Sequence, residues 1–436
     1  MTFDYPGPIE WQDHFNRWVQ LKAEQEAVGL DEKVDEIRRV LDAMLADVIA
    51  LPEDDTLAAA EPDDLQGIRS LRPSGRRRIW DEIPMDEYRN RLEGALLGRC
   101  AGCTLGSPVE LFPIEKMERW AGHIGDPFPP VGYWSAVERP HDLKYKVSPR
   151  GAFTSVQMDG VPTDDDIIYT LLGLLVLEDY GPDFTIEDVG RAWVDYLPYA
   201  HTAEEVALKN LHRGIPAAEA GSIDNPYTQY IGGDIRSDPW AYAAPGFPEK
   251  AAELAYRDAY LTHRRNGIYA EMYFSAVIST AFVVDDAVDA LRIGLEEIPQ
   301  DCRLAQEVRW GLETASEIHD FRDANAAVSE RYAGMHRVHA INNAVLTIWG
   351  LTIGGSDFTK VIGQTVAMSY DNDCTAATAG SIAGAILGRD GVPEHWWAGF
   401  NNKVHSYLNG HAVFAIDDLV DRFIEQANRV VGDNGV

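Results

Sequence analysis

The chain has 436 residues, and its 38 lysines and arginines against 70 aspartates and glutamates give a formal net charge of −32. Hydrophobic residues make up 45% and charged residues 25%, a mix that excludes collagen-like, low-complexity and wholly disordered proteins. The acidic balance argues against strong binding to nucleic acids or anionic membranes, because both need basic patches. Four cysteines are too few for a disulfide framework, and no secretory signal or membrane span is evident, so we expect a cytoplasmic protein.

Residues 1–85 are expected to form a helical extension followed by an acidic linker. Apolar residues recur at helical spacing from Val34 to Val48 and form a narrow seam suited to packing on another helix. Asp31 is placed to cap this helix. The seam makes oligomerisation through the N-terminal helices possible. Residues 52–67 are rich in acidic residues, alanine and proline, which is typical of a linker.

Residues 86–436 are expected to form one compact all-α domain, because apolar segments of helical length follow one another and alternating strand patterns are scarce. A short hairpin is possible within the polar stretch 133–160. The expected helices cover residues 86–103, 164–179, 186–196, 203–212, 248–262, 267–283, 285–297, 303–317, 340–352, 358–369, 375–388 and 416–430.

The first candidate site is residues 162–166, where Thr163 precedes three aspartates at the start of an apolar helix. Asp is common at helix starts because free N–H groups and the helix dipole stabilise it, so capping alone is one interpretation. One cap needs only one side chain, however, and three adjacent carboxylates repel each other. A divalent cation would offset that repulsion, and the threonine hydroxyl would add a further oxygen ligand.

A second acidic helix start lies at Asp371 and Asp373, before a helix built from Ala, Gly, Ser and Thr that a neighbouring helix can approach closely. Two such helix starts can meet around one metal cluster. Glycines at positions 94, 98 and 102 form one face of an earlier helix, and Glu110 follows its end. Taken alone, Glu110 reads as a solvated loop residue.

In this order the motifs resemble the ADP-ribosylglycohydrolase family, which includes the dinitrogenase-reductase-activating glycohydrolases. The resemblance covers about residues 88–400. It rests on the glycine-faced helix with its following G-x-x-L-G-x-P-x-E, on T-D-D, on Thr262-His263, on Arg236-x-x-Pro239 and on D-x-D-x-x-A-A.

The resemblance implies an all-α fold with Mg²⁺ or Mn²⁺, two ions in the family, in a cleft where ribose hydroxyls bind and a glycosidic bond is cut. The implied metal ligands are Thr163, Asp164, Asp165, Asp371, Asp373 and Cys374, the last at a position where the family usually has Ser or Thr. The implied catalytic residues are Glu110 and Asp165. The implied substrate-binding residues are Gly232, Gly233, Arg236, His263 and Tyr370.

Several positions depart from the family pattern. Cys103 replaces an acidic residue, Asp166 replaces a threonine, and Cys374 brings a thiol that is a poor ligand for Mg²⁺. Cys374 either faces a metal or packs within its helix, and Ile231 stands near an expected asparagine. The sequence therefore predicts a metal-dependent hydrolase of an ADP-ribosyl or related ribosyl bond. A nucleoside or nucleotide N-glycoside hydrolase and a catalytically silent binding or structural relative remain as alternatives.

Overall fold

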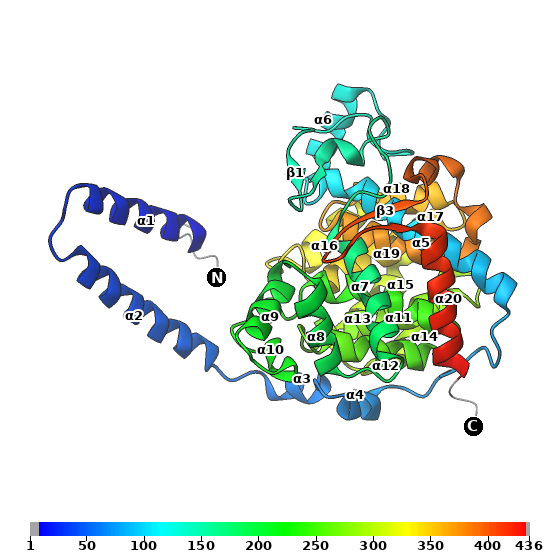
Figure 1. Cartoon of the computed structure of the whole chain (residues 1–436), viewed down its shortest axis with the longest axis horizontal. Helices are drawn as coiled ribbons and strands as arrows, with labels where there is room; N and C mark the ends of the chain where they lie inside the picture. The colour runs from blue at the N-terminus through cyan, green and yellow to red at the C-terminus, as the bar shows by residue number, and fades with distance from the viewer. Residues whose placement is uncertain (1–7, 433–436) are drawn as a thin grey trace. The chain divides into compact units, whose positions relative to one another are not determined.

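The computed structural model describes residues 8–432, and the chain divides into two compact units, Met1–Ala58 and Ala59–Val436. The first unit contains helices α1 (Pro8–Glu24) and α2 (Leu30–Ile49) (Figure 1). The two helices pack so that Phe15 and Ile37 line one shared hollow. The prediction that Asp31 caps α2 is wrong, because Gly29, with φ 76°, holds the cap position. Asp31 lies in the first turn, where its charge still favours the helix dipole.

The second unit is helical almost throughout, which confirms the all-α prediction (Figure 1). The chain enters it through α3 (Asp55–Ala60), and its helices are α4 (Leu65–Leu71), α5 (Met85–Gly106), α6 (Ile114–Ile124), α7 (Asp165–Tyr180), α8 (Ile186–Tyr196), α9 (Thr202–His212), α10 (Ala217–Ala220), α11 (Asp238–Ala243), α12 (Pro248–Ala259), α13 (Asn266–Ala281), α14 (Ala287–Gly294), α15 (Arg303–Thr314), α16 (Phe321–Arg331), α17 (Ala340–Gly354), α18 (Phe358–Ala367), α19 (Asn372–Leu387) and α20 (Ile416–Gly432). Among the described residues, no helix is long and apolar enough to cross a membrane.

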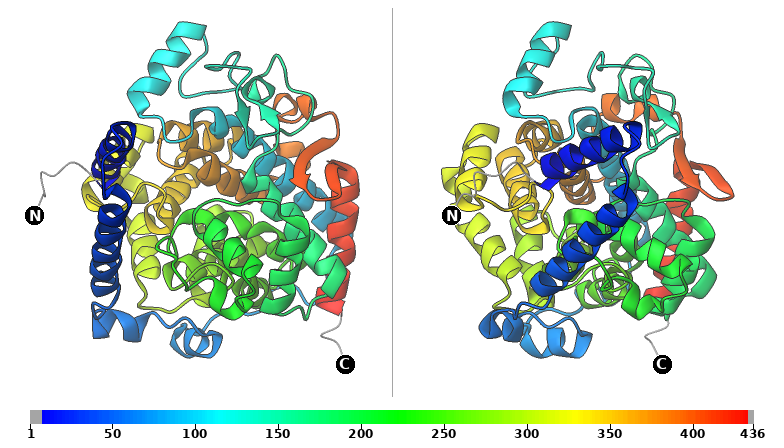
Figure 2. Two further views of the ribbon diagram at one scale, coloured as in Figure 1. Left: turned by 60° about the vertical axis from the view of Figure 1, so that its left-hand side comes forward. Right: turned by 90° about the vertical axis from the view of Figure 1, so that its left-hand side faces the viewer.

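Two small antiparallel hairpins interrupt the helices. Strands β1 (Leu143–Lys144) and β2 (Ser148–Pro149) form the hairpin foreseen within residues 133–160. Strands β3 (Lys403–Leu408) and β4 (His411–Ala415) form the second, which the sequence did not reveal, as it did not reveal α6 and α16. Helix α6 lies at one end of the second unit in every view, while α20, in red, runs along one side (Figure 2).

The glycine face of α5 packs directly against α19. A Cβ atom added at Gly102 would lie 1.9 Å from the carbonyl oxygen of Ala376, and one at Gly106 would lie 2.5 Å from the Cα of Asp373. Only glycine permits such an approach, so these positions cannot carry a side chain without separating the helices. The contact brings the end of α5, and Glu110 just after it, beside the D-x-D turn.

Residues 59–84 belong to the second unit and pack against its helices rather than forming a free linker. Arg72 and Arg77 donate to the buried Glu297 carboxylate at 2.6 and 2.8 Å, and Glu61 pairs with Arg265 at 3.0 Å. The acidic segment predicted as a linker, residues 52–67, therefore contains α3 and the start of α4. The boundary near residue 85 stays a prediction of where the family-type domain begins.

Candidate metal centre

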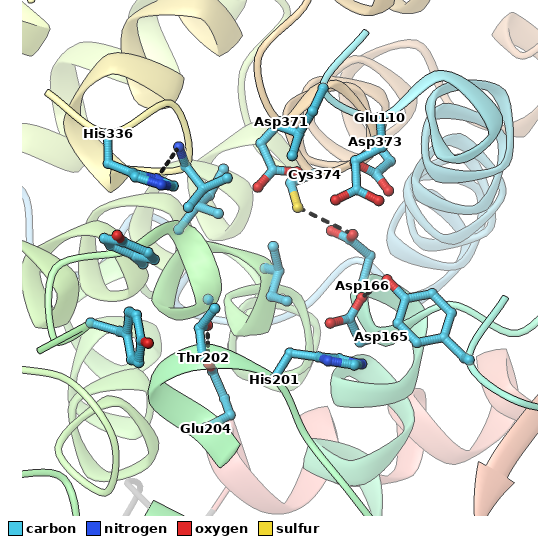
Figure 3. Close-up of a pocket in the computed structure, with 18 of the residues that line it drawn as sticks. Glu110, Asp165, Asp166, His201, Thr202, Glu204, His336, Asp371, Asp373 and Cys374 are labelled. Carbon is cyan, nitrogen blue, oxygen red and sulfur yellow. Dashed lines mark hydrogen bonds between the residues drawn. The ribbon is translucent and has the colours of Figure 1, made fainter. Parts of the chain in front are cut away.

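The N-termini of α7 and α19 face each other across a buried acidic cluster (Figure 3). Asp164 is the N-cap of α7 and accepts a hydrogen bond from the backbone N–H of Asp166, while Asp371 holds the cap position of α19. Three overlapping sets of side chains, each with ligand atoms within 4.8 Å of one another, could hold a metal: Cys103, Asp164 and Asp166; Asp166, Asp373 and Cys374; Glu110, Asp371 and Asp373.

Lys144, on β1, inserts its ammonium group into this cluster. Its Nζ lies 3.1 Å from Asp164 Oδ2, 3.1 Å from Asp373 Oδ2 and 3.2 Å from Glu110 Oε2, and it donates to Ser107 Oγ. Burial alone would lower the pKa of Lys144, but attraction to the three carboxylates outweighs it and raises that pKa. The ammonium therefore stays charged.

The carboxylates around Lys144 carry more negative charge than one ammonium can neutralise. Burial, with mutual repulsion, raises the pKa of Asp165, Asp166 and Asp371, and it raises that of Asp373 to about 7. Asp166 Oδ1 and Asp373 Oδ1 are buried and accept no hydrogen bond from any described residue, and the Arg99 guanidinium lies 3.7 Å from Asp166 Oδ1. Buried carboxylate oxygens without donors fit a hard cation, so the donor set agrees with Mg²⁺ or Mn²⁺.

Cys374 faces the cluster rather than the helix packing behind it. Its Sγ donates to Asp166 Oδ2 at 3.3 Å, and the residue lines the pocket (Figure 3). Of the two orientations left open by the sequence, the structure shows the one directed at the carboxylates. Burial raises the pKa of this thiol, so it stays protonated unless a metal draws the proton off.

A cavity of about 580 Å³ opens beside the cluster and spans two chemically different walls. One wall holds Tyr145, whose hydroxyl donates to Asp165 Oδ1 at 2.6 Å. The opposite wall is aromatic: Tyr230 stacks on His336 with ring centroids 4.8 Å apart, and Tyr227 meets Tyr230 edge-on. The cavity therefore offers oxygen ligands at one end and flat apolar surfaces at the other.

Half of the predicted site residues line this cavity. Those that do are Glu110, Asp165, Gly232, Asp371, Asp373 and Cys374. Those that do not are Thr163, Asp164, Gly233, Arg236, His263 and Tyr370. Asp164 still reaches the cluster through Lys144, whereas Thr163 is buried and lines a neighbouring hollow.

Arg236 and His263 are buried and lie outside the lining of the cavity. Arg236 is 1% exposed and its guanidinium lies 3.1 Å from Glu204, 2.7 Å from Asp258 and 3.0 Å from Glu271. His263 is fully buried, shares a hydrogen bond with Thr262 Oγ1 and lies 3.9 Å from Glu204. Both residues therefore support the loop behind the pocket, where Glu204 packs so closely that Gly232 has no room for a Cβ.

Tyr370 and Gly233 also lie outside the lining of the cavity. The Tyr370 hydroxyl hydrogen-bonds Ser329 Oγ at 3.1 Å, and its backbone, with φ 62°, forms the turn that presents Asp371. A Cβ at Gly233 would meet the carbonyl oxygen of Gly267 at 2.4 Å, so this glycine serves packing. Both positions act through the turn or loop that they shape.

Sequence reasoning missed several residues of the pocket. Lys144, His201, Tyr230 and His336 come from loops or a short strand with no motif around them. Asp166 is the third aspartate of the helix start that the sequence marked as a possible cation site, but it was not among the implied ligands, and its carboxylate belongs to two of the candidate metal sets. The run of three aspartates was the available signal for it.

The fold and the acidic cluster define an all-α protein with a candidate metal centre. A family model described as ADP-ribosylglycohydrolase matches residues 84–430, and the chain therefore belongs to this family. An uncharacterized protein of Archaeoglobus fulgidus is 25% identical over 331 residues, which cover 73% of this chain and 92% of the relative. A solved structure titled ADP-ribosylglycohydrolase-related protein complex aligns with TM-score 0.49 and 20% identity, over 79% of this chain and 99% of the other.

Proposed function

We propose that the protein is a metal-dependent glycohydrolase that cleaves an ADP-ribosyl or related ribosyl glycosidic bond. The observation that carries this proposal is the pair of buried oxygens, Asp166 Oδ1 and Asp373 Oδ1, which lack hydrogen-bond donors at the edge of a cavity large enough for a nucleotide-sized ligand. Family membership supports hydrolysis of a glycosidic bond as the reaction.

Asp166, Asp373 and Cys374 would hold the metal, with Asp371 close by. Bound there, a divalent ion would supply ligation of the ribose hydroxyls and fix the sugar against the carboxylates. The carboxylates themselves favour the positive charge that develops on the sugar ring when the glycosidic bond breaks. The buried cluster provides that negative charge in a place where little water screens it.

Glu110 is the candidate general base. Its side chain is 35% exposed at the cavity wall, so a water molecule can reach it, while Lys144 at 3.2 Å holds one carboxylate oxygen in place. The other oxygen is available to take a proton from water as that water attacks the anomeric carbon.

A nucleoside-type N-glycoside is the second candidate substrate, and the charge of the cavity favours it. Among the described residues that line the cavity there is no arginine, and the only lysine, Lys144, already faces three carboxylates. A pyrophosphate would find no free cationic side chain on these walls. The stacked Tyr230 and His336 offer a surface that suits a planar base.

The test is a substrate panel with Mn²⁺, Mg²⁺ or EDTA: ADP-ribosyl-arginine, ADP-ribosyl-serine peptide, O-acetyl-ADP-ribose and the common nucleosides, with product release followed by chromatography. We expect metal-dependent release from at least one of them. Glu110→Gln should lower kcat by about 10²–10⁴-fold with little change in KM, because an amide cannot accept the proton.

The matched control is Glu115→Gln, the same exchange at an exposed glutamate on α6, which should leave kcat unchanged. Loss of binding with a normal kcat in Glu110→Gln would make Glu110 a binding residue. No release from any substrate, with either metal, would favour the catalytically silent alternative.

A further inference from the structure

The Lys144 ammonium group contacts carboxylates from three chain segments, as a bound metal cation would. Its partners Glu110, Asp164 and Asp373 come from the turn after α5, the start of α7 and the start of α19. The Lys144 side chain is only 12% exposed, and Ser107 Oγ adds a fourth oxygen while itself donating to Asp164 Oδ2 at 2.7 Å. An oxygen cage closed around one positive charge is what a bound cation requires.

Asp373 connects this ammonium to the remaining candidate ligands. Its Oδ2 lies 3.1 Å from Lys144 Nζ, while its Oδ1 is buried and has no hydrogen-bond donor among the described residues. Oδ2 of Asp373 is therefore paired with the ammonium of Lys144. Oδ1 has no cationic side chain of the described residues beside it. This is the arrangement of a carboxylate that bridges two cations, with one of them already provided.

The three sets of possible ligands are not equally available. In the set of Cys103, Asp164 and Asp166, both oxygens of Asp164 are already engaged, Oδ2 by Ser107 and Lys144 and Oδ1 by the N–H of Asp166. The set of Glu110, Asp371 and Asp373 contains two carboxylates that pair with Lys144. The set of Asp166, Asp373 and Cys374 contains the two carboxylates that have a buried oxygen without a hydrogen bond, and of these two oxygens only Asp166 Oδ1 has a cationic side chain near it, that of Arg99 at 3.7 Å. A divalent ion at this set completes their coordination without displacing the ammonium.

The segment that carries Lys144 is fixed on both sides, so the lysine is held at the cluster. The next residue, Tyr145, donates its hydroxyl to Asp165 and receives a hydrogen bond on its carbonyl from Tyr199. Arg150, just beyond β2, donates to the carbonyl of Pro108 at 2.8 Å. Withdrawal of the ammonium would leave Asp164 Oδ2 and Asp373 Oδ2 buried without their positive partner, which is costly.

We propose that Lys144 permanently fills one cation position of this centre and that the chain binds a single divalent ion, at Asp166, Asp373 and Cys374. The proposal rests on the metal site of the proposed function but not on its substrate or reaction. It revises the two-ion centre that the family resemblance implies. Lys144 thereby acts as a positioning residue that neutralises charge and orients Glu110.

The test measures metal stoichiometry on the full-length protein, with Mn²⁺ as the probe, by calorimetry and by electron paramagnetic resonance. The wild type should bind one Mn²⁺ per chain and show the hyperfine pattern of an isolated ion. Lys144→Met keeps an unbranched side chain, one atom shorter, and removes its charge, so this variant should bind two Mn²⁺ with the spectrum of a spin-coupled pair. Lys146→Met, at an exposed lysine on the same hairpin, is the matched control and should bind one.

Two coupled Mn²⁺ ions in the wild type would overturn the proposal, because Lys144 would then have left its position. Binding of none, in wild type and variant alike, would overturn it as well. Lys144→Met leaves the carboxylates to repel one another. If this variant folds poorly, the number of Mn²⁺ ions bound by the wild type tests the proposal by itself. A single bound Mn²⁺ without turnover on the substrate panel would leave this inference standing and contradict the proposed function.

Discussion

The second unit contains two buried carboxylate clusters whose negative charges are balanced to different extents by cationic side chains. Behind the pocket, the Arg236 guanidinium lies within 3.1 Å of three carboxylates, all of them at most 5% exposed. At the pocket, Lys144 faces three carboxylates and three more lie around them, and two oxygens there have no donor among the described residues.

The difference follows from the donors. A planar guanidinium presents five N–H groups in a fixed fork and remains charged when buried, which suits a permanent structural cluster. An ammonium presents three N–H groups and one charge, and Lys144 cannot serve six carboxylates even with Arg99 lying 3.7 Å from Asp166 Oδ1. A cluster that the chain completes with its own side chains stabilises the fold, whereas one left incomplete beside a cavity has room for a cation from solution.

The largest expected effect is the loss of Arg236. Arg236→Met should lower the free energy of unfolding by about 3–5 kcal/mol, because it leaves buried carboxylates without their counter-charge. Urea denaturation followed by circular dichroism measures this loss. Arg191→Met, which removes an exposed ion pair with Asp188, is the control and should change stability little. A stable Arg236→Met variant would show that this cluster does not hold the pocket loop.

The opposite behaviour is expected at the pocket cluster. Asp373→Asn should lower kcat by about 100-fold or more and abolish Mn²⁺ binding, because it removes a ligand charge. Its metal-free form should be at least as stable as the metal-free wild type, since it removes one of several repelling charges. Activity assays and urea denaturation in EDTA test both statements.

Asp390→Asn, at an exposed aspartate beyond the end of α19, is the control for Asp373→Asn and should leave kcat and Mn²⁺ binding unchanged. Destabilisation of metal-free Asp373→Asn to the extent seen for Arg236→Met would contradict the comparison, because the two clusters would then hold the fold alike.

Metal removal should affect the pocket cluster alone. EDTA should lower the Tm and Mn²⁺ should restore it, because an ion bound only by the native state adds ~2.7 kcal/mol at a hundredfold excess over its Kd. The same titration of Asp373→Asn should leave its Tm unchanged. A Tm of the wild type that stays constant across a wide metal titration would mean that no ion binds the cluster with useful affinity.

The contrast between the clusters also shows what the sequence could predict. The two acidic helix starts and the glycine face of α5 are local patterns, so the meeting of α7, α19 and Glu110 followed from them. The role of Arg236 did not follow, because its partners Glu204, Asp258 and Glu271 lie on three other helices and only packing reveals that they enclose it. Lys144 was missed for a related reason: a single lysine in a polar hairpin has no pattern, and only the fold carries it into the cluster.

Replacement of the Cys374 thiol should have the smallest effect on metal binding, because it changes only the ligand atom at one position from sulfur to oxygen. It tests the pocket cluster more finely than the other variants do. The thiol is soft and lies beside hard carboxylate oxygens, and Mn²⁺ tolerates sulfur better than Mg²⁺ does. Cys374→Ser should therefore raise the affinity for Mg²⁺, by roughly tenfold relative to Mn²⁺.

Parallel titrations of Cys374→Ser and wild type with each metal measure this change in preference. Cys302→Ser is the control, because it makes the same exchange at a buried thiol that caps α15 far from the pocket in sequence and outside its lining. Its metal affinities should match those of the wild type. The same Mg²⁺ to Mn²⁺ preference in Cys374→Ser and wild type would show that the thiol is not a ligand, and the ion would then depend on the carboxylates of Asp166 and Asp373 alone.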